Sequence, residues 1–245
     1  RKMLKKLKKY DIIYVLNVKG GSTMIIDLPE KFVHVNRIGE KIAFIDKNRI
    51  LKMKNCVSFK RLMKDITYAK KGNKICYYCG KKMKEGEVTP DHAIPQDMGG
   101  PTIPNNLYPS CSSCNSEKSN LLLQQYLEFR TIKDEEEKKK YRKKCLEENE
   151  LLKYISHSKL LVNMITYMRI TDIKLLKSQR KHTEYHYKKY AEVEKFYETY
   201  NRLKKPIIVD RNLKLLGGFI SLMFAKEHGI GTVPVIILEN VEIIK

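Results

Sequence analysis

Four cysteines near the middle of the chain form two Cys-x-x-Cys pairs, Cys76 with Cys79 and Cys111 with Cys114. Two such pairs at about this separation are typical of a tetrahedral Zn²⁺ site with four thiolate ligands. Disulfides are the weaker interpretation in a chain for which we expect no export signal, and a redox motif of the thioredoxin type would need only one pair. The spacing therefore predicts that the four cysteines bind one structural zinc ion.

Between the two pairs, and just after them, lie the residue types that hydrolysis of a phosphodiester requires. The reaction needs a base that takes a proton from water near neutral pH, and histidine is the side chain suited to this task. It also needs a divalent cation to stabilise charge on the phosphate and on the departing oxygen. Carboxylate and amide oxygens are ligands that Mg²⁺ accepts. We therefore expect His92 to be the base, and Asp91 and Asn115 to hold Mg²⁺.

The expected local structure brings these three side chains together. Asp91 and His92 are adjacent, so on a strand they point to opposite faces, one toward the metal and the other toward the attacking water. Asn115 is expected in the first turn of a helix capped by Ser112 or Ser113, and the N-terminus of that helix would favour an anionic phosphate. The zinc thiolates flank both pieces and would fix the distance between them.

The motifs, taken in order, are C-x-x-C, D-H-x-x-P, G-G, N-N-L and C-x-x-C-N-x-x-K, over roughly a fifth of the chain. This pattern resembles the HNH endonuclease family, the ββα-metal nucleases with a four-cysteine zinc site. The resemblance implies that Asp91 and Asn115 are the catalytic metal ligands, that His92 is the general base and that the products carry 5′-phosphate and 3′-hydroxyl ends. It also implies that Asn106 orients the loop carrying the base and that Lys118 contacts phosphate. Because asparagine rather than histidine occupies the third position of the family's name, Mg²⁺ or Mn²⁺ is expected there rather than Zn²⁺.

The composition favours a polyanionic partner. The 245 residues include 49 Lys and Arg against 28 Asp and Glu, a formal net charge of +21, and the sequence pI is about 9.6. A surplus this large favours nucleic acid, and we expect double-stranded DNA. A run of about 18 apolar residues is missing, so the sequence excludes a membrane span. The basic N-terminal segment lacks the apolar core of a signal peptide, and we expect the protein in the cytoplasm of a bacterium or of a phage-infected host cell.

The expected fold class is α+β, in four parts. A small N-terminal β region is predicted at residues 1–56, the zinc-stabilised ββα-metal nuclease module at 57–130, a helical region at 131–204 and a C-terminal α/β unit at 205–245. The nuclease segment has few periodic apolar positions, so a metal clip is expected to substitute for a core of its own.

The C-terminal unit is expected to run strand, helix, strand. Ile207–Val209 follows Pro206 as a strand, a helix carries apolar side chains from Leu215 to Met223 until Gly229 ends it, and Val233–Leu238 is a buried strand.

This unit also resembles the ParB/sulfiredoxin-like domains, through Ile207-Ile-Val-Asp210, Ala225-Lys-Glu-His-Gly229 and Val233-Pro-Val235. Arg211 follows Asp210 where that family usually has glycine. We therefore expect a DNA-positioning or packing role rather than nucleotide binding.

The function expected from the sequence is a metal-dependent DNA endonuclease. One ββα-metal site cuts one strand, so a double-strand break would require a homodimer or a second visit. Two alternatives stay open: a non-catalytic, zinc-stabilised DNA-binding protein, and a regulatory protein whose C-terminal unit senses a nucleotide.

Overall fold

The computed structural model describes residues 23–70, 75–84, 86–155, 161, 164–176 and 184–244, apart from the side chains of 69–70 and 184–187. The first 22 residues of the predicted N-terminal β region therefore lie outside the described residues. Within the described part, helices are mixed with small sheets, so the predicted α+β class is confirmed. None of the described helices combines the length and apolar character needed to cross a membrane.

The elements follow one another from the N-terminal sheet to the C-terminal strand. The helices are α2 (Phe59–Lys70), α3 (Ser112–Lys118), α4 (Leu123–Phe129), α5 (Glu135–Leu152), α7 (Glu184–Tyr200) and α8 (Phe219–Glu227), and the short 3-10 turns are η2 (Gln96–Met98), η3 (Pro104–Asn106) and η4 (Ile170–Asp172). The strands are β1 (Val33–Val35), β2 (Lys41–Ile45), β3 (Leu51–Lys54), β4 (Val88–His92), β5 (Leu107–Cys111), β6 (Thr166–Arg169), β7 (Ile207–Asp210), β8 (Leu215–Gly217), β9 (Thr232–Leu238) and β10 (Val241–Ile244).

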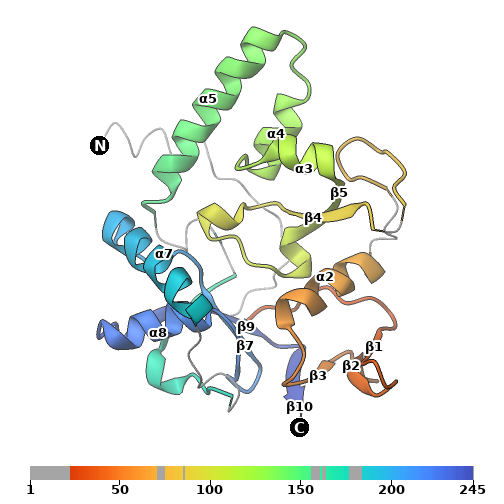
Figure 1. Ribbon diagram of the computed structural model, residues 1–245, viewed down its shortest axis with the longest axis vertical. Coiled ribbons are helices and arrows are strands. Elements are labelled where there is room, and N and C mark those ends of the chain that lie inside the picture. The colour runs from red at the N-terminus through yellow and green to blue at the C-terminus, as the bar shows by residue number, and fades with distance from the viewer. Residues whose placement is uncertain are drawn as a thin grey trace.

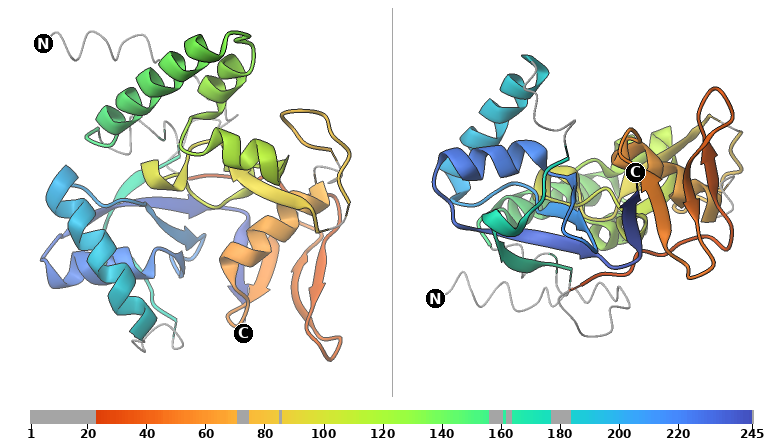
Figure 2. Two further views of the ribbon diagram at one scale, coloured as in Figure 1. Left: turned by 45° about the horizontal axis from the view of Figure 1, so that its top comes forward. Right: turned by 90° about the horizontal axis from the view of Figure 1, so that it is seen from below.

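The two ends of the described chain share one sheet. Strands β1, β2 and β3 pair antiparallel, and β10 pairs parallel with β3, so that Val241 lies opposite Leu51. The dark blue strand at the C-terminus runs beside the orange strands in both views of Figure 2. The predicted first and last parts of the chain are thus joined by backbone hydrogen bonds, and the division into four domains stays a prediction.

Asp210 connects this sheet to the next one. Its wholly buried carboxylate accepts hydrogen bonds from the backbone N–H groups of Asn212 and Lys214 through Oδ1, and from that of Ile243 on β10 through Oδ2. A buried carboxylate with several backbone donors is well satisfied without a ligand. In this structure Asp210 therefore holds the backbone of β10 against the end of β7.

The third sheet has the order β6-β9-β7-β8 and carries α7 and α8. The predicted strands at Ile207–Val209 and Val233–Leu238 are present, but the predicted helix does not begin at Leu215. Leu215–Gly217 instead pairs with β7 as a strand, and α8 starts at Phe219 because Gly218 adopts a left-handed φ of +85°. Both leucines of that strand are buried. A short apolar run indicates burial but does not distinguish a buried helix from a buried strand, which is why the helix was predicted there.

The candidate site lies on the two-stranded hairpin of β4 and β5 in the middle of the molecule. Figure 1 shows this hairpin between α3, α4 and α5 at one end and the two larger sheets at the other. Helix α2 lies against β5 and η3. The long connection between the strands buries Ile94, Met98 and Ile103 in the same core as Leu62 and Met63 of α2. The segment thus shares the main core of the protein.

Candidate active site

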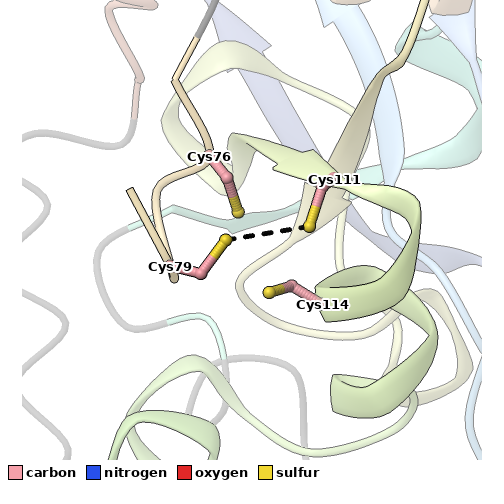
Figure 3. Close-up of side chains that lie close together, drawn as sticks. All are labelled: Cys76, Cys79, Cys111 and Cys114. Atoms are coloured by element: carbon pink, nitrogen blue, oxygen red, sulfur yellow. Dashed lines mark hydrogen bonds between the residues drawn. The ribbon is translucent and has the colours of Figure 1, made fainter. Parts of the chain in front are cut away.

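The four predicted zinc ligands converge. Cys76 and Cys79 lie on the loop before β4, Cys111 ends β5 and Cys114 lies in the first turn of α3, with all four Sγ atoms within 4.8 Å of one another. Tetrahedral zinc with Zn–S bonds of about 2.3 Å places its sulfurs about 3.8 Å apart, and the Cys79 and Cys111 Sγ atoms are 3.9 Å apart. Figure 3 shows the sulfurs turned toward a common centre. The donor set therefore fits structural zinc.

The surroundings of this cluster favour a thiolate at one corner. Burial raises the pKa of the Cys111 thiol, but hydrogen bonds from the Ser113 hydroxyl and the backbone N–H of Cys114 outweigh burial and lower that pKa to about 6. A thiolate is the form that binds zinc. Tyr78 and Tyr126 pack edge to face beside the cluster, with ring centroids 4.9 Å apart, and keep that side of it apolar.

The two expected metal ligands lie on the two elements that meet where α3 contacts β4. Thr89 and Asp91 are two residues apart on β4 and share one face, whereas Asn115 and Lys118 are three apart on α3 and share another. The Asn115 amide donates to the Thr89 hydroxyl at 3.2 Å, and Lys118 pairs with Asp91. The amide oxygen of Asn115 and the Asp91 carboxylate therefore lie on the same interface. The residue before this helix is Cys111, so neither serine is the cap that the sequence predicted.

Asp91 has partners that sequence reasoning missed. Its carboxylate, 5% exposed, accepts a hydrogen bond from the Tyr78 hydroxyl and pairs at 3.1 Å with the Lys118 ammonium, which is fully buried. Lys118 Nζ also donates to the His92 carbonyl at 2.8 Å. Burial lowers the pKa of Lys118 and the Asp91 charge opposes that shift. In the structure the Lys118 side chain is buried and holds Asp91 and the His92 carbonyl. The phosphate contact expected for Lys118 stays a prediction.

His92 ends β4 and is 9% exposed, and its Nε2 lies 3.0 Å from the Thr102 hydroxyl. Burial and four surrounding positive charges lower the pKa of His92 to about 3, so the imidazole is neutral near pH 7. Those charges, in order of effect, belong to Lys205, Lys118, Lys60 and Lys64. A neutral imidazole is the form that can accept a proton. Only Lys118 was singled out from the sequence, since the other lysines lie outside the motif.

Asn106 joins the two ends of the loop that follows His92. Its Oδ1 accepts from the Ile94 N–H at 2.9 Å, and its Nδ2 donates to the carbonyls of Ile94 and Pro101 at 3.2 and 2.9 Å. Gly99 adopts a φ of +92°, and a Cβ on Gly100 would lie 1.8 Å from the Ile94 carbonyl oxygen. The Gly-Gly motif is therefore required by one left-handed residue and one close backbone approach.

A strand pair and a following helix, clamped by four cysteines and carrying Asp-His on the strand and Asn on the helix, form a ββα unit. Residues 76–127 match the model of a family described as HNH endonuclease. This match and the zinc-compatible cysteine cluster support a nuclease or DNA-related function.

One solved structure with a similar segment is described as the C2221 form of a Pnob8-like ParB-N domain. The similarity has 17% sequence identity and a TM-score of 0.24, and it covers 30% of this chain and 28% of that one. The chain therefore spans little more than a quarter of that relative. This solved structure is described as the same kind of domain that the sequence of the C-terminal unit resembles. A TM-score this low supports no conclusion about fold or function. A search of curated proteins found no match.

Proposed function

We propose that the protein is a metal-dependent endonuclease that hydrolyses phosphodiester bonds of DNA. The observation that carries the proposal is the contact of α3 with β4 beside the cysteine cluster, which supports a site shared by Asp91 and His92 of β4 and Asn115 of α3. This arrangement supports the proposal because it combines a candidate base, candidate metal ligands and a scaffold that positions them.

The side chains divide the chemistry between them. The neutral His92 imidazole takes a proton from water, and the resulting hydroxide forms a bond to phosphorus as the bond to the 3′ oxygen breaks. The products are a 5′-phosphate and a 3′-oxygen that takes up a proton. Asp91 and Asn115 would hold Mg²⁺ or Mn²⁺, which supplies charge stabilisation to the phosphate and the leaving oxygen when bound. Asn106 keeps the loop after His92 closed through its three hydrogen bonds.

The proposed substrate is double-stranded DNA. The net charge of +21 would supply affinity for the phosphate backbone, and that affinity should fall steeply with salt. One site would nick one strand, so cutting both strands would need a homodimer or a second visit. The proposed location is the cytoplasm.

Plasmid nicking with Mg²⁺ or Mn²⁺ tests the proposal. We expect wild type to convert supercoiled plasmid to the open circle, and His92→Ala to lose this activity while keeping its zinc. His228→Ala is the matched control, because His228 is an exposed histidine of the C-terminal unit, and it should cut like wild type. Cutting by His92→Ala at the rate of wild type would remove the proposed base.

A zinc-shaped DNA-binding module without cleavage is the second candidate. The observation in its favour is the Asp91–Lys118 ion pair, because a carboxylate that already pairs with a buried ammonium is a weaker ligand for a cation. This alternative predicts retarded DNA in a gel and no cleavage with any divalent metal. The plasmid assay therefore distinguishes the two candidates.

A further inference from the structure

The segment that enters β7 contacts the loop of the candidate site. Lys205 donates from Nζ to the Gln96 side-chain oxygen at 2.7 Å, and Lys204 Nζ lies 3.0 Å from Asp97 Oδ1. Both partners belong to η2, the turn a few residues after the candidate base. Lys153, which directly follows α5, reaches the other Asp97 oxygen at 2.5 Å. The C-terminal unit is thus fastened to the candidate site by polar contacts.

Lys205 differs from the other two lysines in this contact because its partner carries no negative charge. Lys204 and Lys153 share the Asp97 carboxylate, whereas Lys205 meets a neutral amide oxygen. Within the part of the chain that the structure describes, Lys205 forms no ion pair, and its side chain is partly buried. Burial first, and then other lysines, lower the pKa of Lys205 to about 8, so it still carries its proton near pH 7. A partly buried cation without an ion-pair partner is unfavourable for folding.

Lys205 is one of three lysines in the segments that pack around the hairpin of the candidate base. Lys205 contacts the turn that begins four residues after His92, and Lys60 and Lys64 belong to α2, which packs against β5, the partner strand of β4. Lys60 and Lys64 are four residues apart and so share one face of the helix. Three lysines from two segments far apart in the sequence therefore lie in the parts of the chain that pack against the hairpin and the loop after His92. A positive field of this kind attracts an anion of the size of a phosphate.

We infer that Lys205 binds the DNA phosphate at the cleavage position, so that the C-terminal unit completes the nuclease site in the middle of the chain. The inference deepens the proposed function and rests on it. A lysine ammonium is a compact point charge suited to phosphate, and the Gln96 oxygen directs it without neutralising it. Lys60 and Lys64 flank this position as further contacts to the DNA backbone. The anion supplies the charge partner that Lys205 lacks in the free protein.

Lys205→Met tests the inference, because methionine keeps the apolar stem and removes the charge. The matched control is Lys226→Met, which removes one positive charge from an exposed position of the same unit. Lys205→Met should reduce the slope of log affinity against log salt for a DNA duplex by about one unit, as expected for one lost phosphate contact. It should slow single-turnover nicking at saturating DNA by roughly 100-fold, the cost of removing one donor to a reacting anion. Lys205→Arg should recover much of both.

A third measurement separates substrate binding from a structural role. Because an unpaired buried charge opposes folding, Lys205→Met should raise the melting temperature of the free protein, by about 2 °C or more. A variant that melts lower, with an unchanged salt slope, would overturn the inference. So would a Lys226→Met control that loses as much slope as Lys205→Met. If wild type binds DNA but does not cut, the proposed function fails, and the salt slope alone still decides whether Lys205 holds phosphate. Wild type without salt-dependent DNA binding overturns both.

Discussion

The buried ion pair between Asp91 and Lys118 allows a direct test of how this site is held together. Lys118→Met keeps the length and apolar stem of the side chain and removes only the ammonium. The change leaves the Asp91 carboxylate, 5% exposed, with the Tyr78 hydroxyl as its remaining partner, and it deprives the His92 carbonyl of its donor. A buried charge that has lost its partner is the main expected consequence.

The magnitude follows from the burial of both groups. Removing one partner of a buried ion pair destabilises proteins by about 3–5 kcal/mol, because the other charge stays buried without compensation. That range includes the free energy lost with the hydrogen bond from Lys118 to the His92 carbonyl. The double variant Asp91→Asn/Lys118→Met removes both charges and should recover part of the loss, with a coupling energy of about 2 kcal/mol.

Urea unfolding of wild type, the two single variants and the double variant measures these free energies. The zinc concentration and temperature must be held fixed, because bound metal contributes to the apparent stability. We expect Lys118→Met to lower the unfolding midpoint strongly, with little change of slope. A Lys118→Met protein that unfolds at the midpoint of wild type, yet loses DNA affinity and salt slope, would refute the reasoning. Lys118 would then be a phosphate contact, as the sequence suggested.

Three further outcomes are expected. Gly100→Ala should lower the free energy of unfolding by about 3 kcal/mol and abolish nicking, because its Cβ would collide with the Ile94 carbonyl; a variant that melts and cuts like wild type would contradict this. Metal analysis should find one zinc per folded chain, and chelation should cause the ββα unit to lose its tertiary structure; folded protein without zinc would contradict this. Finally, the folded pKa of Lys205, about 8, is below its ordinary value of about 10.4. The unfolded chain binds more protons between these values, so wild type should gain stability relative to Lys205→Met as pH rises from about 8 to 10.4. Melting curves across that range check this, and a constant difference would contradict it. The charged groups that face Lys205 are Lys60, Lys204, Lys189 and Glu192.

The sequence predicted the cysteine cluster, for a physical reason. A four-thiolate zinc site requires two closely spaced pairs, so Cys76, Cys79, Cys111 and Cys114 could be assigned from spacing alone, and their sulfurs do converge. The alternation of a strand likewise predicts that Asp91 and His92 point to opposite faces, and the structure does form a strand at Val88–His92. Such features depend on residues within one element or within one metal coordination sphere.

Long-range features were not predictable from the pattern. The family resemblance implied that Lys118 contacts phosphate, whereas its buried ammonium pairs with Asp91 and the His92 carbonyl across the helix–strand contact. The pairing of β10 with β3 joins residues nearly 200 positions apart, and nothing local specifies it. The apolar pattern from Leu215 onward correctly indicated buried residues. It predicted a helix where the structure has a strand, because Gly218 delays the start of the helix to Phe219.

The motif segment does not contain everything that positions its own residues. Ile94, Met98 and Ile103 of the loop after His92 are buried against side chains of α2, which precedes the matched residues 76–127. The same loop is fastened by Lys204 and Lys205, which follow them. A fragment limited to the matched residues would expose those three side chains to water, at roughly 2 kcal/mol for each. The zinc cluster can fix the hairpin and α3, but the orientation of the loop beyond His92 depends on elements from both sides. Activity should therefore require the chain from α2 to β7 at least, and a truncated ββα unit that cuts as fast as the whole chain would show that the loop is ordered by zinc alone.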